Sequence, residues 1–193
     1  MASSSFTDIL DFWFGSPFAS DRGRSRKAWF EKSAVFDTEI RDRFLLTWER
    51  AAKGELDSWR DTPLASMALV IVLDQFPRNM FRNEARAFST DALALLVANR
   101  MLEAGFDRLL RPLERMFVYL PFEHAENIDA QKRSIALFDA LAAAPLGLDN
   151  ARWAKSHHDI VARFGRFPHR NAVLGRSSTP QELEFLKQPG SSF

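Results

Sequence analysis

Apolar residues recur at steps of three and four along almost the whole chain of 193 residues. This spacing puts them on one face of a helix, and no apolar–polar alternation bounded by turn residues is long enough to favour a strand. The pattern predicts an all-α fold, an irregular antiparallel array of about nine helices. The predicted helices cover residues 6–14, 26–33, 37–53, 63–75, 90–104, 112–120, 127–143, 150–164 and 180–187.

Two of these helices have starts that are clearly marked by a threonine before a proline. Thr62-Pro63 and Thr179-Pro180 each place a capping hydroxyl before a residue that fits the first helical position. Glu182 completes a capping box with Thr179.

The chain shows no composition break or Pro/Gly/Ser-rich linker, so we expect a single domain over residues 1–193. The longest apolar run, residues 64–73, is about half the length of a membrane span, which predicts a core helix and no membrane partner. Cysteine is absent, which excludes disulfides and thiolate metal sites, and the N-terminus shows no basic leader. We therefore expect a cytoplasmic protein.

Charge is balanced overall, with 26 basic and 25 acidic residues, which argues against a nucleic-acid partner. Residues 152–176 nevertheless contain six basic residues and one acid, Asp159, and arginine outnumbers lysine 20 to 6 in the whole chain. Guanidinium groups suit bidentate capture of carboxylate or phosphate. This bias predicts an anionic partner, although an arginine-rich genome would produce the same composition.

Three corners of the chain combine phenylalanine, proline and polar residues. The first is "LDQFPRNMFR", residues 73–82, where Pro77 is expected to end the helix at Phe76. The second is "RFGRFPHRN", residues 163–171, and the third is "MFVYLPFEHAEN", where Pro121 is expected to break the helix.

We hypothesise that the three corners gather into one arginine-rich pocket that also holds a carboxylate and a histidine. The opposing interpretation is that each arginine only pairs with nearby helix carbonyls and each asparagine only forms a turn. The candidate ligand-binding residues are Gln75, Arg78, Asn79, Arg82, Glu123, His124, Arg163, Arg166, His169, Arg170 and Asn171.

A metal site is a further possibility, because "HHD" at residues 157–159 resembles the His-Asp doublet of helical metal-dependent phosphohydrolases. No aspartate follows Asp159, however, and the surrounding arginines repel a cation, so we predict no metal. His157 shares a helical stripe with Trp153 and Ile160, which indicates a hydrogen-bonded core histidine. The glycines form no phosphate-binding loop, and no cofactor is expected.

Six runs of sequence together resemble one known family. They are "LDFWFG", "LDQFPRNMFR", "AFSTDALAL", "ERMFVYLPFEHAE", "RFGRFPHRN" and "LGRSSTPQELEFL", in this order. The chain resembles domain-of-unknown-function family 924 from Ile9 to about Leu186. The resemblance implies a tetratricopeptide-like all-helical fold in a soluble bacterial protein, and it implies no activity.

Two functions follow from these patterns. The first is a binding module whose Arg/Asn-lined pocket holds a peptide carboxylate or an anionic small molecule. The alternative is a hydrolase-type enzyme with Glu123 or His124 as general base and Arg78, Arg163 or Arg170 stabilising negative charge.

Overall fold

The computed structural model describes residues 3–20, 22–144 and 150–192, and this part of the chain is helical without a strand. The prediction of an all-α fold is confirmed. The helices are α1 (Phe6–Phe14), α2 (Ala34–Ala52), α3 (Pro63–Val70), α4 (Phe76–Met80), α5 (Asp91–Glu103), α6 (Pro112–His124), α7 (Ile128–Ala142), α8 (Ala151–Phe164) and α9 (Pro180–Phe185). The tetratricopeptide-like character and the single-domain organisation stay predictions.

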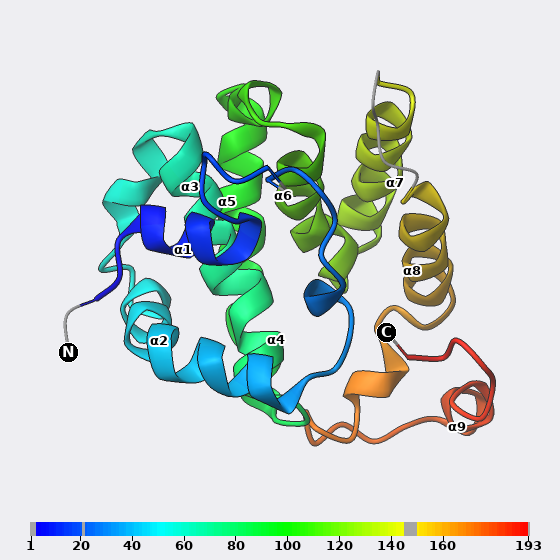
Figure 1. Ribbon diagram of the computed structural model, residues 1–193. Helices are drawn as coiled ribbons and strands as arrows, with labels where there is room; N and C mark the ends of the chain where they lie inside the picture. The colour runs from blue at the N-terminus through cyan, green and yellow to red at the C-terminus, as the bar shows by residue number, and fades with distance from the viewer. Residues whose placement is uncertain (1–2, 21, 145–149, 193) are drawn as a thin grey trace.

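The segment formed by α3 and α4 runs through the middle of the array (Figure 1). Helix α1 packs on α3 and α2 packs on α4, while α5 and α6 line the other side of the same segment. Helices α7 and α8 pack against each other beyond α6, and α9 lies at the edge (Figure 1). The buried aromatic and aliphatic residues of α1 to α7 form one continuous core.

The capped helix starts follow the sequence closely. Thr179 accepts a hydrogen bond from the Glu182 amide at 3.2 Å, and the Glu182 carboxylate accepts one from the Thr179 amide at 2.7 Å. Pro63 opens α3 after Thr62, although the Thr62 side chain makes no capping hydrogen bond. The capping box therefore marks the start of α9, whereas Pro63 at the first helical position marks the start of α3 without a side-chain cap.

The prediction of a helix over residues 26–33 is wrong. Only a 3-10 turn, Lys27–Trp29, forms there. The indole of Trp29 donates to the Trp13 carbonyl at 3.0 Å, and Arg26 donates to the carbonyls of Phe12 and Trp13 at 2.7 and 2.9 Å. These bonds to the end of α1 hold the segment outside a regular helix.

The prediction that Pro77 ends the helix is also wrong. The chain passes through a π-helical turn, Ile71–Gln75, and continues as α4. Pro77 has no N–H to donate to the Leu73 carbonyl, and the Thr90 hydroxyl donates to that carbonyl instead, at 2.6 Å. The π-turn places Asp74 in the interior with no solvent exposure, and such turns are frequent at functional sites.

Pro121 does not break its helix either, because α6 continues through it to His124. Glu123 and His124 therefore belong to the last turn of α6 and not to the loop that follows. Glu123 is buried and His124 is partly exposed, both at the end of the helix nearest to α8 and the π-turn.

Candidate functional site

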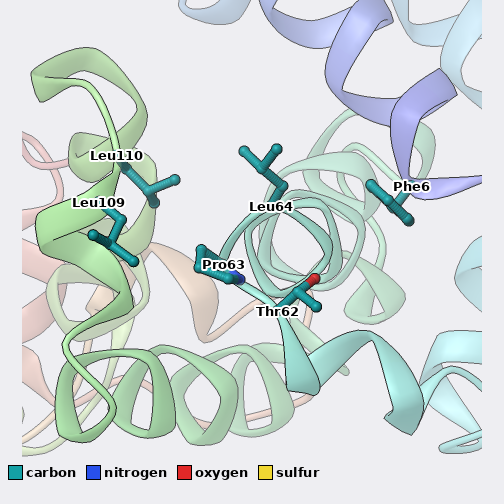
Figure 2. Close-up of a pocket in the computed structure, with 6 residues that line it drawn as sticks. All are labelled: Phe6, Thr62, Pro63, Leu64, Leu109 and Leu110. Atoms are coloured by element: carbon teal, nitrogen blue, oxygen red, sulfur yellow. The ribbon is translucent and has the colours of Figure 1, made fainter.

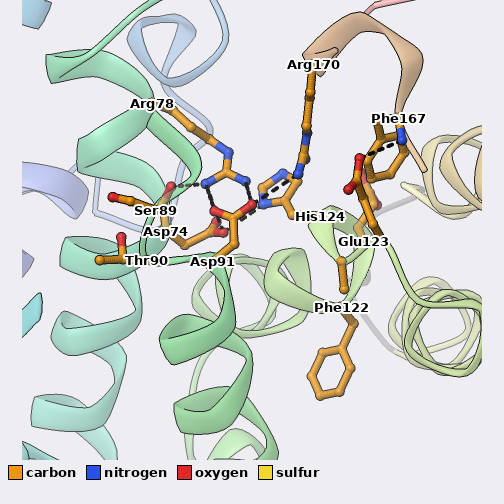
Figure 3. Close-up of polar contacts among 12 residues, drawn as sticks. Asp74, Arg78, Ser89, Thr90, Asp91, Phe122, Glu123, His124, Phe167 and Arg170 are labelled. Carbon is orange, nitrogen blue, oxygen red and sulfur yellow. Dashed lines mark hydrogen bonds and ion pairs between the residues drawn. The ribbon is translucent and has the colours of Figure 1, made fainter. Parts of the chain in front are cut away.

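Five segments meet at one group of charged side chains. Asp74 comes from the π-turn, Arg78 from α4, Asp91 from the start of α5, His124 from the end of α6, and Arg170 from the 3-10 turn Pro168–Arg170. Figure 3 shows the Arg78 guanidinium facing the carboxylates of Asp74 and Asp91, with His124 and Arg170 beside the same carboxylates. We call these five residues the central cluster. The structure thus brings together one residue or more from each of the three predicted corners.

Asp74 is the buried anchor of the central cluster. His124 Nδ1 lies 2.8 Å from Asp74 Oδ1, and Gln75 Nε2 donates to Oδ2 at 2.6 Å. Burial alone would raise the pKa of Asp74, but Arg78 and His124 outweigh it and hold this pKa at about 2. The ionised carboxylate therefore accepts a hydrogen bond from the Nδ1–H of His124 and orients the ring.

Arg78 is the best satisfied cation of the central cluster. Its two terminal nitrogens donate to the two oxygens of Asp91 at 2.9 and 3.0 Å, a bidentate pair. Its Nη1 also donates to the Asp74 carbonyl at 2.5 Å and lies 3.2 Å from the Asp74 carboxylate. Arg78 is therefore committed to carboxylates of the chain itself.

Arg170 differs sharply from Arg78. Its guanidinium carbon lies 4.5 Å from the centre of the Phe88 ring and 4.6 Å from that of Phe167. Its Nη1 donates to Asp91 at 3.2 Å, whereas its Nε is buried without a partner among the described residues. Burial and the neighbouring Arg78 lower the pKa of Arg170 to about 10. This cation is desolvated without full compensation.

Glu123 and His157 form a second buried pair next to the central cluster. Glu123 Oε1 lies 3.3 Å from His157 Nδ1, and Glu123 Oε2 is buried without a partner in the described part of the chain. Burial, and then the charge of Asp74, raises the pKa of Glu123 to about 8. His157 Nδ1 faces the Trp153 carbonyl at 2.9 Å, which confirms the predicted core histidine, and burial lowers its pKa to about 3.

The backbone that carries Arg170 is held by Glu126. This carboxylate accepts two hydrogen bonds from Arg176, at 2.6 and 2.9 Å, and one from the Phe167 amide at 2.7 Å. The set of candidate residues includes neither Glu126, Arg176 nor Asp91. The first-turn position of Asp91 in α5 is typical of an acid that favours the helix dipole, so the sequence carries no separate signal for its pairing with arginines.

Two predicted residues of the first corner lie elsewhere. Asn79 Nδ2 donates to Asp37 of α2 at 2.7 Å, and Arg82 pairs with both oxygens of Asp37 at 2.7 and 2.8 Å. They line a surface depression of about 310 Å³ between α2 and α4, here called the α2–α4 depression. Its lining residues are Ala34, Asp37, Thr38, Arg41, Asn79, Met80 and Arg82.

The remaining predicted residues of the last corner are spread over the neighbourhood of α8 and α9. Arg166 pairs with Glu182 of α9 at 2.7 and 2.8 Å, and Arg163 stacks on the Phe164 ring at 4.6 Å. Asn171 donates to Ser178 at 3.0 Å. His169 is packed beside the Phe167 ring at 5.7 Å, and burial lowers its pKa to about 4. One pocket shared by all the candidate residues is therefore not formed, and their role in ligand binding stays a prediction.

An apolar depression of about 390 Å³ lies on another face of the molecule (Figure 2). The residues that line it are Phe6, Thr62, Pro63, Leu64, Leu109 and Leu110. Leu64 and Leu109 are exposed there. None of the sequence patterns points to this surface.

The histidine–aspartate doublet has a local explanation. His158 Nδ1 lies 3.2 Å from Asp159, and Lys155 donates to the same carboxylate at 2.9 Å. Among the residues that the structure describes, no group of three or more His, Asp or Glu side chains is placed to hold a metal ion. Within the same residues, no helix has the length and apolar character needed to cross a membrane.

Comparison with known proteins agrees with the architecture. The chain is 42% identical to a protein of unknown function, ATU0120 from Agrobacterium tumefaciens, whose structure superimposes with a TM-score of 0.82 over 94% of this chain and 96% of that one. Among curated proteins, none matches the chain. A family model described as bacterial protein of unknown function (DUF924) matches residues 9–190. With nearly its whole length matched, the chain belongs to this bacterial family, DUF924.

Proposed function

We propose that the central cluster binds the carboxylate of a small molecule, with Arg170 as the principal contact. The observation that carries the proposal is the incomplete bonding of Arg170, a residue only 6% exposed. A guanidinium offers five N–H donors, and a buried donor without an acceptor costs about 1–3 kcal/mol. An incoming carboxylate would supply the missing acceptors as charge-assisted hydrogen bonds.

The shape of the surroundings favours a planar ligand group. The rings of Phe88 and Phe167 cover Arg170, which leaves the edges of the guanidinium for hydrogen bonds. The side chains of Arg78, Asp91 and His124 are 20%, 16% and 15% exposed, so solvent reaches the rim of the cluster. A small carboxylate needs less exposed surface at this rim than an internal segment of a peptide does.

The geometry also favours a second candidate, a hydrolase-type enzyme with His124 as general base. Asp74 accepts a hydrogen bond from the Nδ1–H of His124, so Nε2 is the ring nitrogen that can accept a proton from water. Burial and Arg78 lower the pKa of His124, which keeps the ring neutral at neutral pH. Arg170, whose hydrogen bonding is incomplete, would then stabilise the negative charge that develops on a substrate carbonyl oxygen.

Carboxylate binding is tested by calorimetry and thermal unfolding with malonate and acetate, at constant ionic strength. We compare the wild type with Arg170→Lys, and with Arg163→Lys as a control away from the central cluster. A ligand at a hundred times its Kd stabilises the fold by about 2.7 kcal/mol. The proposal predicts binding that weakens in Arg170→Lys and persists in Arg163→Lys. Equal binding in all three proteins, or none, would refute it.

The enzyme candidate has its own assay. Hydrolysis of p-nitrophenyl acetate should be lost in His124→Asn if His124 takes the proton from water. Equal rates for the wild type and His124→Asn would exclude His124 as the base, while leaving the binding proposal to be judged by calorimetry.

A further inference from the structure

The segment Arg78-Asn79-Met80-Phe81-Arg82 contributes to two separate sites. Arg78 turns to Asp74 and Asp91 in the central cluster, whereas Asn79 and Arg82 turn to Asp37 of α2. The carboxylates on the two sides of α4 are different, so the α2–α4 depression does not depend on the function proposed for the central cluster.

We infer that the α2–α4 depression is a binding site for the phosphate group of a small phosphate monoester. Its volume of about 310 Å³ lies at the lower end of the range for small-molecule sites and leaves room for one small polar group and its substituent. The lining combines two guanidinium groups, a carboxamide and a threonine hydroxyl, all of which are donors to phosphate oxygens.

The charges of the depression favour an anion. Arg82 makes its bidentate pair with Asp37, and the ion pairs of the described residues give Arg41 no carboxylate. Arg41 donates instead to the Met80 carbonyl, with its guanidinium 5.4 Å from the centre of the Phe81 ring. The lining of the depression thus contains two positive charges, Arg41 and Arg82, and one negative charge, Asp37, which pairs with Arg82.

The donors are also held in place before a ligand arrives. Asp37 fixes Arg82 and the Asn79 carboxamide with three hydrogen bonds of 2.7, 2.7 and 2.8 Å. Burial would raise the pKa of Asp37, but the hydrogen bonds from Arg82 and Asn79 outweigh burial and lower this pKa. The carboxylate therefore stays ionised and keeps its hydrogen bonds to both side chains. Preorganised donors lose less entropy on binding.

Phosphate fits this arrangement better than carboxylate does. A phosphate monoester carries up to two negative charges at neutral pH and presents three terminal oxygens. The lining offers Arg41, Arg82 and the Thr38 hydroxyl as donors to these oxygens, and the second negative charge of the phosphate strengthens its attraction to the two guanidinium groups relative to a carboxylate. The Arg82 side chain is 33% exposed, so the ligand enters directly from solvent.

The test is a titration with inorganic phosphate and with glycerol 3-phosphate. Binding is measured by calorimetry and by amide NMR shifts, and sodium acetate is the competing anion. The variant is Arg41→Gln, which leaves the Asp37–Arg82 pair intact, and Arg100→Gln is the exposed control. We expect phosphate binding that weakens by at least about tenfold in Arg41→Gln and stays unchanged in Arg100→Gln and Arg170→Lys.

Three results would overturn the inference. They are the absence of phosphate binding to the wild type, equal phosphate affinity in Arg41→Gln, and acetate bound as tightly as phosphate. If Arg41→Gln does not fold, the NMR titration of the wild type shows where phosphate binds. Shifts confined to Thr38, Asn79 and their neighbours support the site, and shifts at Asp91 and His124 instead assign the phosphate to the central cluster and overturn it.

Discussion

Replacing Glu123 with glutamine tests whether the fold holds a protonated carboxyl group beside the central cluster. Glu123 is 4% exposed, one of its oxygens has no partner among the described residues, and Asp74 adds a negative charge nearby. These features raise its pKa from the ordinary 4.5 to about 8. Glutamine has the shape of the neutral acid and never ionises.

The sign and size of the effect follow from proton linkage. Because the folded state has the higher pKa, the stability due to neutral Glu123 is fully present below pH 4.5 and is lost as the pH rises to about 8. A tenfold change in an ionisation constant corresponds to about 1.4 kcal/mol, so the loss amounts to roughly 4–5 kcal/mol. Folded domains have only about 5–15 kcal/mol of stability, and such a loss is readily measured.

The assay is urea unfolding followed by tryptophan fluorescence at pH 5, 7 and 9. His157 and His169 have lowered pKa values, so the free energy of unfolding of both proteins also falls as the pH falls. The comparison therefore uses the difference in the free energy of unfolding between Glu123→Gln and the wild type at each pH. We expect the two proteins to differ least at pH 5 and the variant to gain by several kcal/mol at pH 9. Glu103→Gln, at an exposed position, is the control. Parallel pH profiles for the wild type and Glu123→Gln would refute the reasoning.

Three further predictions follow from other contacts. Thr90→Val leaves the buried Leu73 carbonyl without its donor and should cost about 1–3 kcal/mol in urea unfolding, whereas Thr90→Ser should cost less; equal losses would contradict the role of the hydroxyl. Gly165→Ala should cost about 1 kcal/mol in urea unfolding, because φ is +70° there, a conformation that residues with a side chain rarely adopt. No atom lies within 4 Å of the added methyl group, so the cost would come from the backbone and not from a clash, and an unchanged midpoint would contradict it. Asp91→Asn removes the carboxylate that Arg78 and Arg170 share, and the variant should have a lower thermal midpoint. It should bind malonate more tightly in calorimetry, because Asp91 competes with the ligand for the two arginines. Weaker binding would show that Asp91 helps the ligand instead.

The parts of the fold that local chemistry decides could be predicted from the sequence. The Thr179 capping box is one such part, since its partners are three residues apart. The effect of Pro77 could not be predicted, because the donor that replaces its missing N–H is Thr90, 17 residues from the carbonyl it satisfies. The helix expected around Trp29 failed for the same reason, since its bond to Trp13 is a long-range contact.

The candidate site was predictable to a similar extent. The three runs that combine phenylalanine, proline and polar residues predict that Arg78, His124 and Arg170 lie close together, and the structure brings these three together, although Pro77 and Pro121 do not end their helices. Their carboxylate partners could not be chosen from the sequence, because Arg170 and Asp91 are 79 residues apart. The same limit applies to Asp37, which takes Asn79 and Arg82 away from the central cluster through contacts over more than 40 residues.

The most direct test of the account is an NMR titration of the arginine Nε–H signals with malonate, in which the Arg170 signal is assigned by its absence from Arg170→Lys. If this buried guanidinium is the principal contact of a bound carboxylate, its Nε–H signal shifts with malonate and reaches saturation together with the calorimetric binding curve. A signal that stays fixed while malonate binds would show that Arg170 Nε–H does not contact the bound carboxylate, and it would contradict the proposed function.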